Sequence, residues 1–374
     1  MTIPRDLSNL APGANTSGVL QPSKGGTGLT SPGTSGNVLT SNGTAWVSQA
    51  LSAAPTQQIF TFTALTGTFA RGATKAGTYS QTGTTVTVTF TAHGFIAGDR
   101  VYLDFTTGTA SDAWFTIATA ATNTFTVTRA SATTSGNVTI YPPVVVTVNN
   151  HGQTTGASVY VDYSATFTDG VETIYQATTN TFQTQGGTNT AGTNTSGNVT
   201  LPLIGAIQTW NRPTNCKKLF VQLVGGGSGV SASAGGGTGG GYSQEWIDVT
   251  AVSSVSVTVG APGLNISSSE TGGTTSFGAY CSATGGAYSQ SSSNPGLGSG
   301  GDLNLRGGRP YALFGNTAAL ITGGSVFGEG AYLDNNPTSA APTGYGVGAG
   351  RVTVCSTLYQ ELATAGVVFV TEYY

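Results

Sequence analysis

Residues 86–105 read VTVTFTAHGFIAGDRVYLDF, and residues 144–163 read VVVTVNNHGQTTGASVYVDY. In each stretch an apolar run with Thr leads through a His-Gly pair to a second run that begins Val-Tyr. The alternation of apolar and polar residues in VTVTF and VYLDF predicts half-buried β-strands with one inward face. Because the pattern occurs twice in the same order, the sequence predicts two copies of one small β-module.

The repeat continues downstream of these two stretches. Asn123-Thr124-Phe125 recurs as Asn180-Thr181-Phe182, and SGNVTI at 135–140 recurs as SGNVTL at 196–201. Turn residues divide the runs at about 8–12-residue intervals, a spacing typical of a small β-sandwich or β-barrel. We assign residues 71–142 to the first module, 143–203 to the second and 51–70 to a connector. A module of about 60 residues has a marginal core by itself. We therefore expect it to stack on its neighbour or on identical chains.

The composition excludes several classes of protein. Only 7% of residues are charged, against about 25% in an ordinary globular protein, and the net charge is −3. No Lys or Arg lies between Arg129 and Arg212, so the middle of the chain cannot follow a phosphate backbone, and we expect no nucleic-acid partner. No apolar run approaches the roughly 20 residues of a membrane span, so we expect no membrane insertion. MTIPRDLSNLAPG at the start lacks the apolar stretch of a secretory signal.

The first 50 residues have a composition of their own. Pro, Gly, Asn and Ser occur every few residues, and no apolar periodicity lasts long enough for an independent core. We expect an extended segment that is ordered by contact with another protein. PSKGGTG at 22–28, followed by SPGTSGNVLTSNGTAW ending at Trp46, resembles a stretch that recurs in bacteriophage tail-fibre and tail-collar proteins. The resemblance implies that residues 1–50 anchor the chain to baseplate or tail proteins of a virion.

Residues 204–374 hold more than half of the 57 glycines. Runs such as KKLFVQLVGGG and SVSVTVGAPG predict strands that end in glycine turns. Gly inside regular structure costs about 0.5–1 kcal/mol of stability relative to Ala. A block with this many glycines therefore predicts backbones that pack where no Cβ fits. This block resembles the glycine-rich C-terminal domain at the tips of many phage fibres. The Ser-, Asn- and Pro-rich stretches at 288–300 and 332–345 depart from the plain glycine pattern and are interpreted as inserted loops.

Motifs of catalysis and cofactor binding are absent or lack their context. GGGTGG at 235–240 matches G-x-G-x-x-G, but it leads into YSQEWIDV, which reads as a strand, whereas a dinucleotide site needs a helix there. KGGTG at 24–28 has the residues of a phosphate loop in the wrong order, and no G-x-S-x-G is present. A glycan hydrolase needs two carboxylates about 5–10 Å apart. The nearest cluster is Asp99, Asp104 and Asp112, and the recurrence of Asp104 as Asp162 favours a structural role. We expect no enzymatic activity and no cofactor.

The histidines and cysteines are also assigned structural roles. His93 and His151 occupy equivalent positions of the repeat, which predicts the same task in a turn before Gly; a metal ion shared on a symmetry axis between copies is the alternative. The three cysteines form neither a disulfide framework nor a zinc pattern. We expect free, mostly buried thiols.

Receptor binding is the function that the remaining residues favour. Sugars bind to aromatic faces together with amide or carboxylate hydrogen bonds, and paratopes use a similar set of Tyr, Ser, Gly and Asn. The two inserted loops carry such residues. The candidates are Tyr288, Gln290, Asn294, Tyr332, Asp334, Asn335, Asn336 and Tyr345.

Together these observations predict an all-β, elongated multi-domain fibre with an anchor, two modules as a shaft and a glycine-rich tip. The expected function is attachment of a phage tail to a host surface glycan or outer-membrane protein. We expect a homotrimer that is assembled in the host cytoplasm and located in the virion tail. The alternatives are an architectural baseplate or collar component without receptor contact, or a tail-associated glycan-degrading enzyme.

Overall fold

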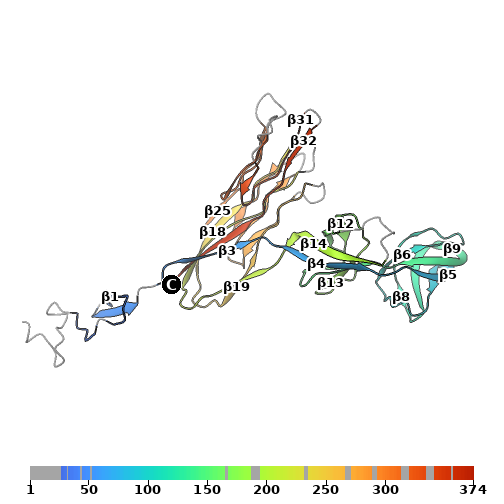
Figure 1. The fold of residues 1–374 in the computed structure, drawn as a ribbon, viewed down its shortest axis with the longest axis horizontal. Coiled ribbons are helices and arrows are strands. Elements are labelled where there is room, and N and C mark those ends of the chain that lie inside the picture. The colour runs from blue at the N-terminus through green and yellow to red at the C-terminus, as the bar shows by residue number, and fades with distance from the viewer. Residues whose placement is uncertain are drawn as a thin grey trace, which may run out of the picture.

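The described part of the chain is built from β-strands. The structure is a computed structural model that describes residues 27–374 except 32, 43, 51–52, 165–166, 187–193, 231–234, 266–270, 289–292, 313–319, 334–340 and 355–356. Within these residues it contains strands β1 to β33, all sheet pairings are antiparallel, and there is no helix (Figure 1). None of these residues belongs to a helical segment with the length and hydropathy of a membrane span. The predicted all-β class is confirmed.

The first module has a sheet of five strands. The strands are β5 (Lys75–Thr89), β9 (Thr124–Tyr141), β6 (Arg100–Asp104) and β7 (Ala113–Thr116), paired in that order, with β8 (Thr119–Ala120) also paired to β9. Alternate residues of β5 and β9 point into a core that includes Val86, Val88, Leu103 and Phe125. The period-two pattern in the sequence therefore corresponds to an inward and an outward face.

The second module has a sheet of six strands. Their order is β12 (Gly170–Thr173), β11 (Ser158–Tyr163), β14 (Thr195–Gly205), β4 (Ala64–Arg71), β10 (Val144–Thr147) and β13 (Thr181–Thr184). Phe69 of β4 packs edge-to-face on Tyr163 and Phe167 at 5.2 and 5.4 Å between ring centroids. Strand β4 is thus a central part of this module, although the sequence places it in the connector at 51–70.

The two modules repeat the same local hydrogen bonds. His93 Nδ1 accepts from the amide of Phe95, and His151 Nδ1 accepts from the amide of Gln153, both at 3.0 Å. The next glycines, Gly94 and Gly152, have φ of +75° and +66°, a conformation that favours glycine. The predicted turn before Gly is therefore present in both copies.

A second equivalent pair of contacts supports the residue that precedes each histidine. Ala92 and Asn150 have φ of +52° and +50°, which is uncommon for residues other than glycine. The amide of Ala92 donates to Asn123 Oδ1, and the amide of Asn150 donates to Asn180 Oδ1, both at 2.9 Å. The recurrent Asn-Thr-Phe of the sequence therefore supplies the acceptor that holds this turn.

The domains are nested in the chain and do not follow one another. Strand β3 (Thr56–Thr61) pairs with β33 (Val367–Tyr373) of the C-terminal domain. The first module is inserted between β4 and β10 of the second, and both modules are inserted between β3 and β15 (Gln208–Asn211). The expected connector therefore supplies strands to two domains, and the modules do not separate the N-terminal segment from the glycine-rich domain. Short apolar runs at 59–60 and 65–70 do not specify their partners, because strand pairing is decided by residues far away in sequence.

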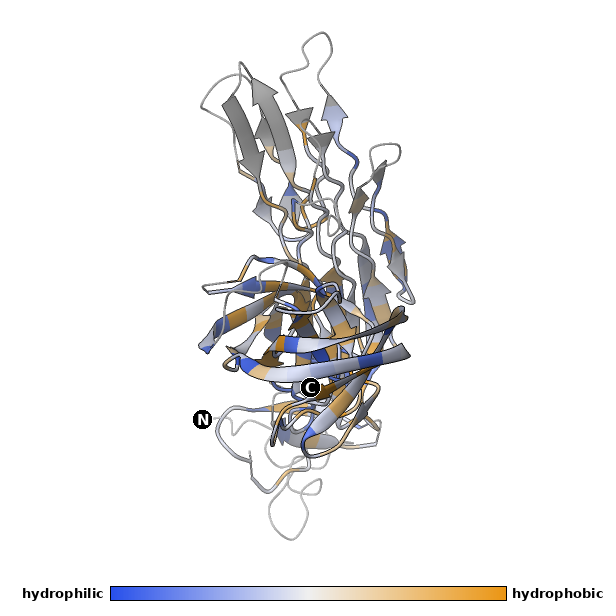
Figure 2. Cartoon of the chain, turned by 90° about the vertical axis from the view of Figure 1, so that its right-hand side faces the viewer, coloured by the Kyte–Doolittle hydropathy of each residue, from blue (hydrophilic) through white to orange (hydrophobic). Residues whose placement is uncertain are grey.

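The base of the glycine-rich domain consists of two packed sheets. One contains β25 (Leu303–Leu305), β18 (Tyr242–Asp248), β16 (Lys218–Val224), β33 and β3. The other contains β15, β19 (Ser254–Thr258), β20 (Thr275–Phe277), β21 (Cys281–Ala283) and β24 (Gly298–Ser299). Their shared core surrounds the fully buried Trp210. Residues of high hydropathy gather in this base and in the two modules (Figure 2).

A buried carboxylate fixes the edge strand β3 to this base. Glu372 is 2% exposed and accepts hydrogen bonds from Gln58 Nε2 at 2.6 Å and Trp210 Nε1 at 2.8 Å. Thr56 Oγ1 donates to the same carboxylate at 2.5 Å. Because a buried charge requires such donors, Glu372 connects strands that are more than 300 residues apart in the chain.

Beyond the base, extended glycine segments pack against one another without side chains. The central segment is 236–241, whose glycines have no positive φ. In the described part of the chain its backbone hydrogen bonds reach six other segments, at 225–228, 284, 296, 308, 323 and 346–349. A β-strand can pair with only two neighbours. Segment 236–241 therefore directs its amides and carbonyls to more neighbours than a strand of a sheet does. We call this arrangement the glycine lattice.

The lattice explains the glycine content of residues 204–374. A Cβ added to Gly239 would overlap the carbonyl oxygen of Gly324, and one added to Gly227 would overlap that of Val347. These neighbours are backbone atoms that are themselves hydrogen-bonded and cannot rotate away. The predicted packing of backbones where no Cβ fits is confirmed.

Short strand pairs extend the lattice away from the base. They comprise β17 (Gly235–Gly236), β22 (Ala287–Tyr288), β23 (Ser293–Asn294), β26 (Tyr311–Ala312), β27 (Leu320–Ile321), β28 (Gly328–Glu329), β29 (Tyr332–Leu333), β30 (Thr343–Gly344), β31 (Gly350–Val354) and β32 (Thr357–Glu361). In Figure 1, β31 and β32 lie at the end of the domain opposite β3 and β19. The domain therefore has a base next to the N-terminal segment and a far end that carries short hairpins.

The N-terminal segment contributes one hairpin, formed by β1 (Asn37–Ser41) and β2 (Trp46–Ala50). Residues 1–26 of the predicted anchor lie outside the described residues. In the described part of the chain, β1 and β2 pair only with each other. A single two-stranded hairpin is marginally stable in water, which agrees with a segment that needs a partner.

Candidate functional site

Two of the predicted binding positions form the base of one hairpin. Strands β22 and β23 pair Ala287 with Asn294 and Tyr288 with Ser293. Asn294 is exposed, and Gln290 lies outside the described residues. Thr238 of the lattice holds this hairpin, because its hydroxyl lies 3.3 Å from the carbonyl oxygens of both Ala287 and Asn294.

The predicted loop 288–300 is shorter than the sequence suggested. After Asn294 the chain enters the lattice, where Gly296 donates to the carbonyl of Gly239 at 2.9 Å. Gly298 and Ser299 then form β24, which pairs with β21. In the sequence, Gly296 and Gly298 indicate that the lattice begins here, because a Cβ at either position would overlap backbone atoms. Only the part up to Asn294 extends beyond the lattice.

The second predicted loop begins at β29. Tyr332 pairs with Ile321 of β27, and Ile321 also pairs with Tyr311 of β26. The base is held by Thr322, whose hydroxyl accepts from the amide of Ala331 at 2.8 Å. Asp334, Asn335 and Asn336 lie outside the described residues.

Tyr345, the last candidate, lies against the lattice and the base. Its amide donates to the carbonyl of Phe327 at 3.1 Å, and its ring is 6.2 Å from that of Phe369. It packs beside the buried residues Val224, Tyr242 and Val367. The structure therefore places Tyr345 in a packing role and separates it from the two hairpins.

The β22–β23 hairpin and the β27–β29 pair both contact lattice segment 236–241. Thr238 supports the β22–β23 hairpin, and the adjacent Gly237 accepts through its carbonyl from the amide of Gly323, which directly follows Thr322. Two loops that are some 40 residues apart in sequence therefore begin on neighbouring segments. The described bases of the two predicted loops are therefore neighbours on the lattice.

Sequence reasoning missed one residue of the sheet β26-β27-β29. Tyr311 is 68% exposed, and it occupies the same row of the sheet register as Ile321 and Tyr332. The signal was the stretch GGRPY at 307–311, in which Pro and Tyr end a lattice segment. An exposed Tyr is suited to stacking on a sugar or to a protein contact.

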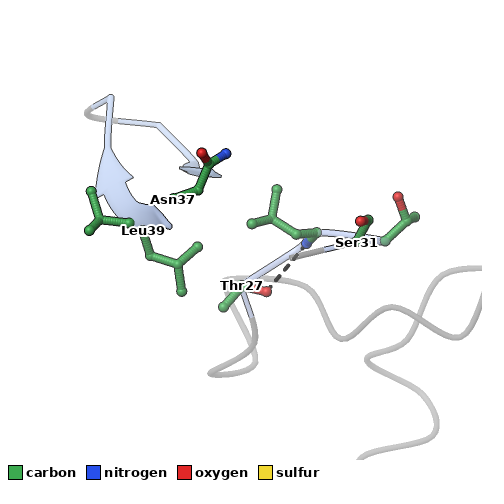
Figure 3. A pocket seen from close by; sticks show the side chains of 7 residues that line it. Thr27, Ser31, Asn37 and Leu39 are labelled. Carbon is green, nitrogen blue, oxygen red and sulfur yellow. Dashed lines mark hydrogen bonds between the residues drawn. The ribbon is translucent and has the colours of Figure 1, made fainter. Parts of the chain in front are cut away.

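A separate surface occurs in the N-terminal segment. Thr27, Leu29, Thr30 and Ser31 lie opposite Asn37, Val38 and Leu39 across an open hollow of about 580 Å³ (Figure 3). Val38, Leu39 and Trp46 are exposed. No charged residue occurs between Lys24 and Arg71. The segment thus presents an uncharged, partly apolar surface.

The histidines are not placed for a metal ion shared between chains. His93 and His151 are 3% and 2% exposed, and each ring packs edge-to-face on a phenylalanine of its own module, at 5.3 and 5.0 Å. Their Nε2 atoms are buried and have no hydrogen-bond partner in the structure. Among the described residues no three His, Cys, Asp or Glu side chains converge as metal ligands.

The carboxylates of the modules bind backbone amides. Asp112 accepts from the amide of Phe105, and Asp169 accepts from the amide of the equivalent Tyr163, both at 2.8 Å. Asp99 accepts from Gln183 Nε2 at 2.9 Å and so connects the first module to the second. These three carboxylates therefore hold the backbone and join the two modules.

Two of the three cysteines are described, and both are free and buried, as expected. Burial raises the pKa of Cys281 to about 12 and also raises the pKa of Cys216. Such thiols are poor nucleophiles near neutral pH. Cys355 lies outside the described residues.

Comparison with known proteins supports one part of the chain. A family described as a glycine-rich domain matches residues 200–367. The comparison with curated proteins finds no match. Residues 200–367, which contain the lattice and the strands of the base other than β3 and β33, therefore form a glycine-rich domain.

Proposed function

We propose that this chain is a structural protein of a bacteriophage tail fibre that attaches the virion to a glycan on the host surface. The observation that carries the proposal is the common contact with lattice segment 236–241 of the β22–β23 hairpin and of the β27–β29 pair, which leads into the second predicted loop. A lattice without side chains cannot supply recognition groups, because specificity needs placed polar and aromatic side chains. It can hold loops rigidly, and loops on a rigid scaffold are where binding residues concentrate.

The N-terminal segment is proposed to hold the chain to other tail proteins. Its short hairpin, its exposed Leu39 and Trp46 and the absence of charge between Lys24 and Arg71 support contact with a partner. The segment leads directly into β3, which pairs with β33 at the base of the glycine-rich domain. The hairpins at the far end are then presented away from the attachment point.

Attachment of this kind gains from multiple copies. If three chains assemble, each weak site is presented three times, and avidity can exceed single-site affinity by about 10²–10⁴-fold. We accordingly propose a homotrimer located in the virion tail and assembled in the host cytoplasm. No catalytic step is included in the proposed function.

The test is a binding measurement with the full-length chain. Tyr288, Asn294, Tyr332 and Asn335 are each replaced by Ala, and binding to an array of bacterial surface glycans and to whole cells is measured. We expect binding to fall while the melting temperature stays unchanged. Tyr280→Ala is the matched control, because this exposed Tyr follows β20 in the base.

Two outcomes would contradict the proposal. Unchanged binding by all four folded variants would reject these hairpins as the receptor site. Release of reducing ends from a glycan on the array, abolished by substitution of one Asp or Glu, would assign the chain to the glycan-degrading enzymes instead.

A further inference from the structure

One face of the sheet β25-β18-β16-β33-β3 is only partly covered. The residues that point to the other face lie in the core with Trp210. On the open face the register aligns Trp246, Phe220, Thr371 and Gln57 in one row across four strands. Trp246 is 49% exposed, and Ile59 in the adjacent row is 54% exposed. We call this surface the aromatic face.

The aromatic side chains of this face contact one another. The rings of Phe220 and Trp246 are 4.8 Å apart, and those of Trp246 and Tyr373 are 5.1 Å apart. On the same face, nearer the start of β33, Phe327 packs on Phe369 at 5.0 Å between ring centroids and covers Phe369. In the described part of the chain nothing comparable covers Trp246. A contiguous exposed apolar surface of this kind marks an interaction site.

The polar groups of the aromatic face are suited to contact with an identical surface. Gln57, Gln222 and Gln244 point to this face, because they pair in register with Thr371, Phe369 and each other. Gln222 Nε2 donates to the hydroxyl of Tyr242, which in turn donates to Gln244 Oε1, at 2.8 and 2.7 Å. The amide of Gln57 both donates and accepts, so it can pair with the same residue of another copy. A carboxylate or an ammonium group would repel its own copy.

The charges at the edge of this face are of both signs. Lys218 and Asp248 are direct partners in the register of β16 and β18. The pKa of Asp248 is lowered, mainly by hydrogen bonds from Thr250 and to a lesser extent by the charge of Lys218. Asp302, whose carboxylate accepts from the amide of Trp246 at 3.1 Å, adds one further negative charge at this edge. The face therefore carries few charges, and these include both signs.

The aromatic face is close in sequence to the N-terminal surface. Its edge strand β3 follows the β1–β2 hairpin after residues 51–55, and the whole stretch between Lys24 and Arg71 is uncharged. Exposed Leu39 and Trp46 of the hairpin and exposed Ile59 of β3 are thus close in sequence. Chains that associate through the hairpin would bring their aromatic faces near one another.

From these observations we infer that the aromatic face packs against a second copy of this chain. Trp246 lies at the centre of the contact, Phe220, Tyr373 and Ile59 surround it, and the amide of Gln57 forms hydrogen bonds between copies. The inference deepens the proposed function, on which it rests, by naming the surface through which copies of the fibre protein associate. Buried aromatic residues at the centre of such contacts carry most of the binding energy.

The experiment measures the molar mass of the full-length chain by light scattering and sedimentation from 1 to 100 µM. We expect the wild type to have a multiple of the 37.4 kDa chain mass. Trp246→Gln should raise the dissociation constant at least about tenfold, and the double variant with Ile59→Gln should be monomeric. Ile207→Gln is the matched control, because Ile207 is highly exposed and lies outside the aromatic face.

The measured molar mass can contradict the inference in two ways. A wild-type mass of one chain at every concentration, or an unchanged mass of the double variant, would overturn the inference. So would a monomeric wild type that loses binding to a neutral glycan on Trp246→Gln, since the face would then be a sugar platform. Melting temperatures of the variants verify folding, because Trp246 lies outside the core.

The glycan-array measurement and the mass measurement test different proposals. Loss of glycan binding with intact association refutes the proposed function and leaves the contact between copies in place.

Discussion

Replacing Gly239 by Ala tests whether the glycine lattice stabilises the C-terminal domain. The new Cβ would overlap the carbonyl oxygen of Gly324 and lie 2.7 Å from its carbon. It would also lie 3.2 Å from the amide nitrogen of Gly308. The backbone of Gly239 donates to Gly308 and accepts from Gly296, both at 2.9 Å. The methyl group therefore fits only if at least one neighbouring segment moves and breaks a hydrogen bond.

The expected loss follows from these contacts. Overpacking a tight interior costs about 1–3 kcal/mol, and a buried backbone group left without a partner costs about 1–3 kcal/mol more. Restriction of the unfolded chain by Ala returns only about 0.4–1 kcal/mol. We expect a net destabilisation of roughly 1–5.5 kcal/mol. For a domain of this size that corresponds to a decrease in melting temperature of about 2–22 °C.

Differential scanning calorimetry of the full-length chain measures this decrease. The control is Gly170→Ala in the second module, where an added Cβ meets nothing within 4 Å and φ is not positive. It should change the transition by less than about 0.5 kcal/mol. A transition of the glycine-rich domain that is equally stable in wild type and Gly239→Ala would refute the reasoning, because a lattice that accepts a methyl group is not packed as described.

Three further predictions concern other parts of the molecule. Glu372→Gln should destabilise the base by about 2–4 kcal/mol in urea unfolding, because charge-assisted hydrogen bonds from Trp210 and β3 are weakened; an unchanged midpoint would contradict this. Burial raises the pKa of Cys281 to about 12, so its contribution to stability is complete below about pH 8.5 and decreases above it by about 1.4 kcal/mol per pH unit. Cys281→Ala should therefore flatten the alkaline decrease in melting temperature, and an equally steep decrease in the variant would rule this out. Asn123→Ala and Asn180→Ala should each cost about 1–2 kcal/mol, and clearly different costs would show that the two turns are not equivalent.

Local features of the fold could be predicted because they depend on nearest neighbours. Alternation in VTVTF and VYLDF is a property of one strand, and the repeated His-Gly pair specifies its turn through an amide two residues away. The glycine density of residues 204–374 predicted a core without Cβ atoms. The steric reason, overlap with a neighbouring backbone, is the same at every such position.

The candidate site was predicted only in part. The sequence selected Tyr288, Asn294 and Tyr332 by residue type, and the structure places them in hairpins that extend from the lattice. The sequence selected Tyr345, whose ring packs on Phe369, and did not select Tyr311, which is exposed. Exposure depends on which distant segment covers a side chain, and no local pattern records that.

The sequence by itself determined that this chain is β-structured, duplicated in its middle and built on a backbone core at its end. Only the tertiary structure decided that these parts are nested. Strand β3 pairs with β33, and β4 pairs with β10 and β14 across an inserted module. A strand of six to eight residues offers the same hydrogen-bonding edge to many partners. The choice among them is made by side-chain packing over more than 300 residues of sequence, as in the contact of Thr56 and Gln58 with Glu372.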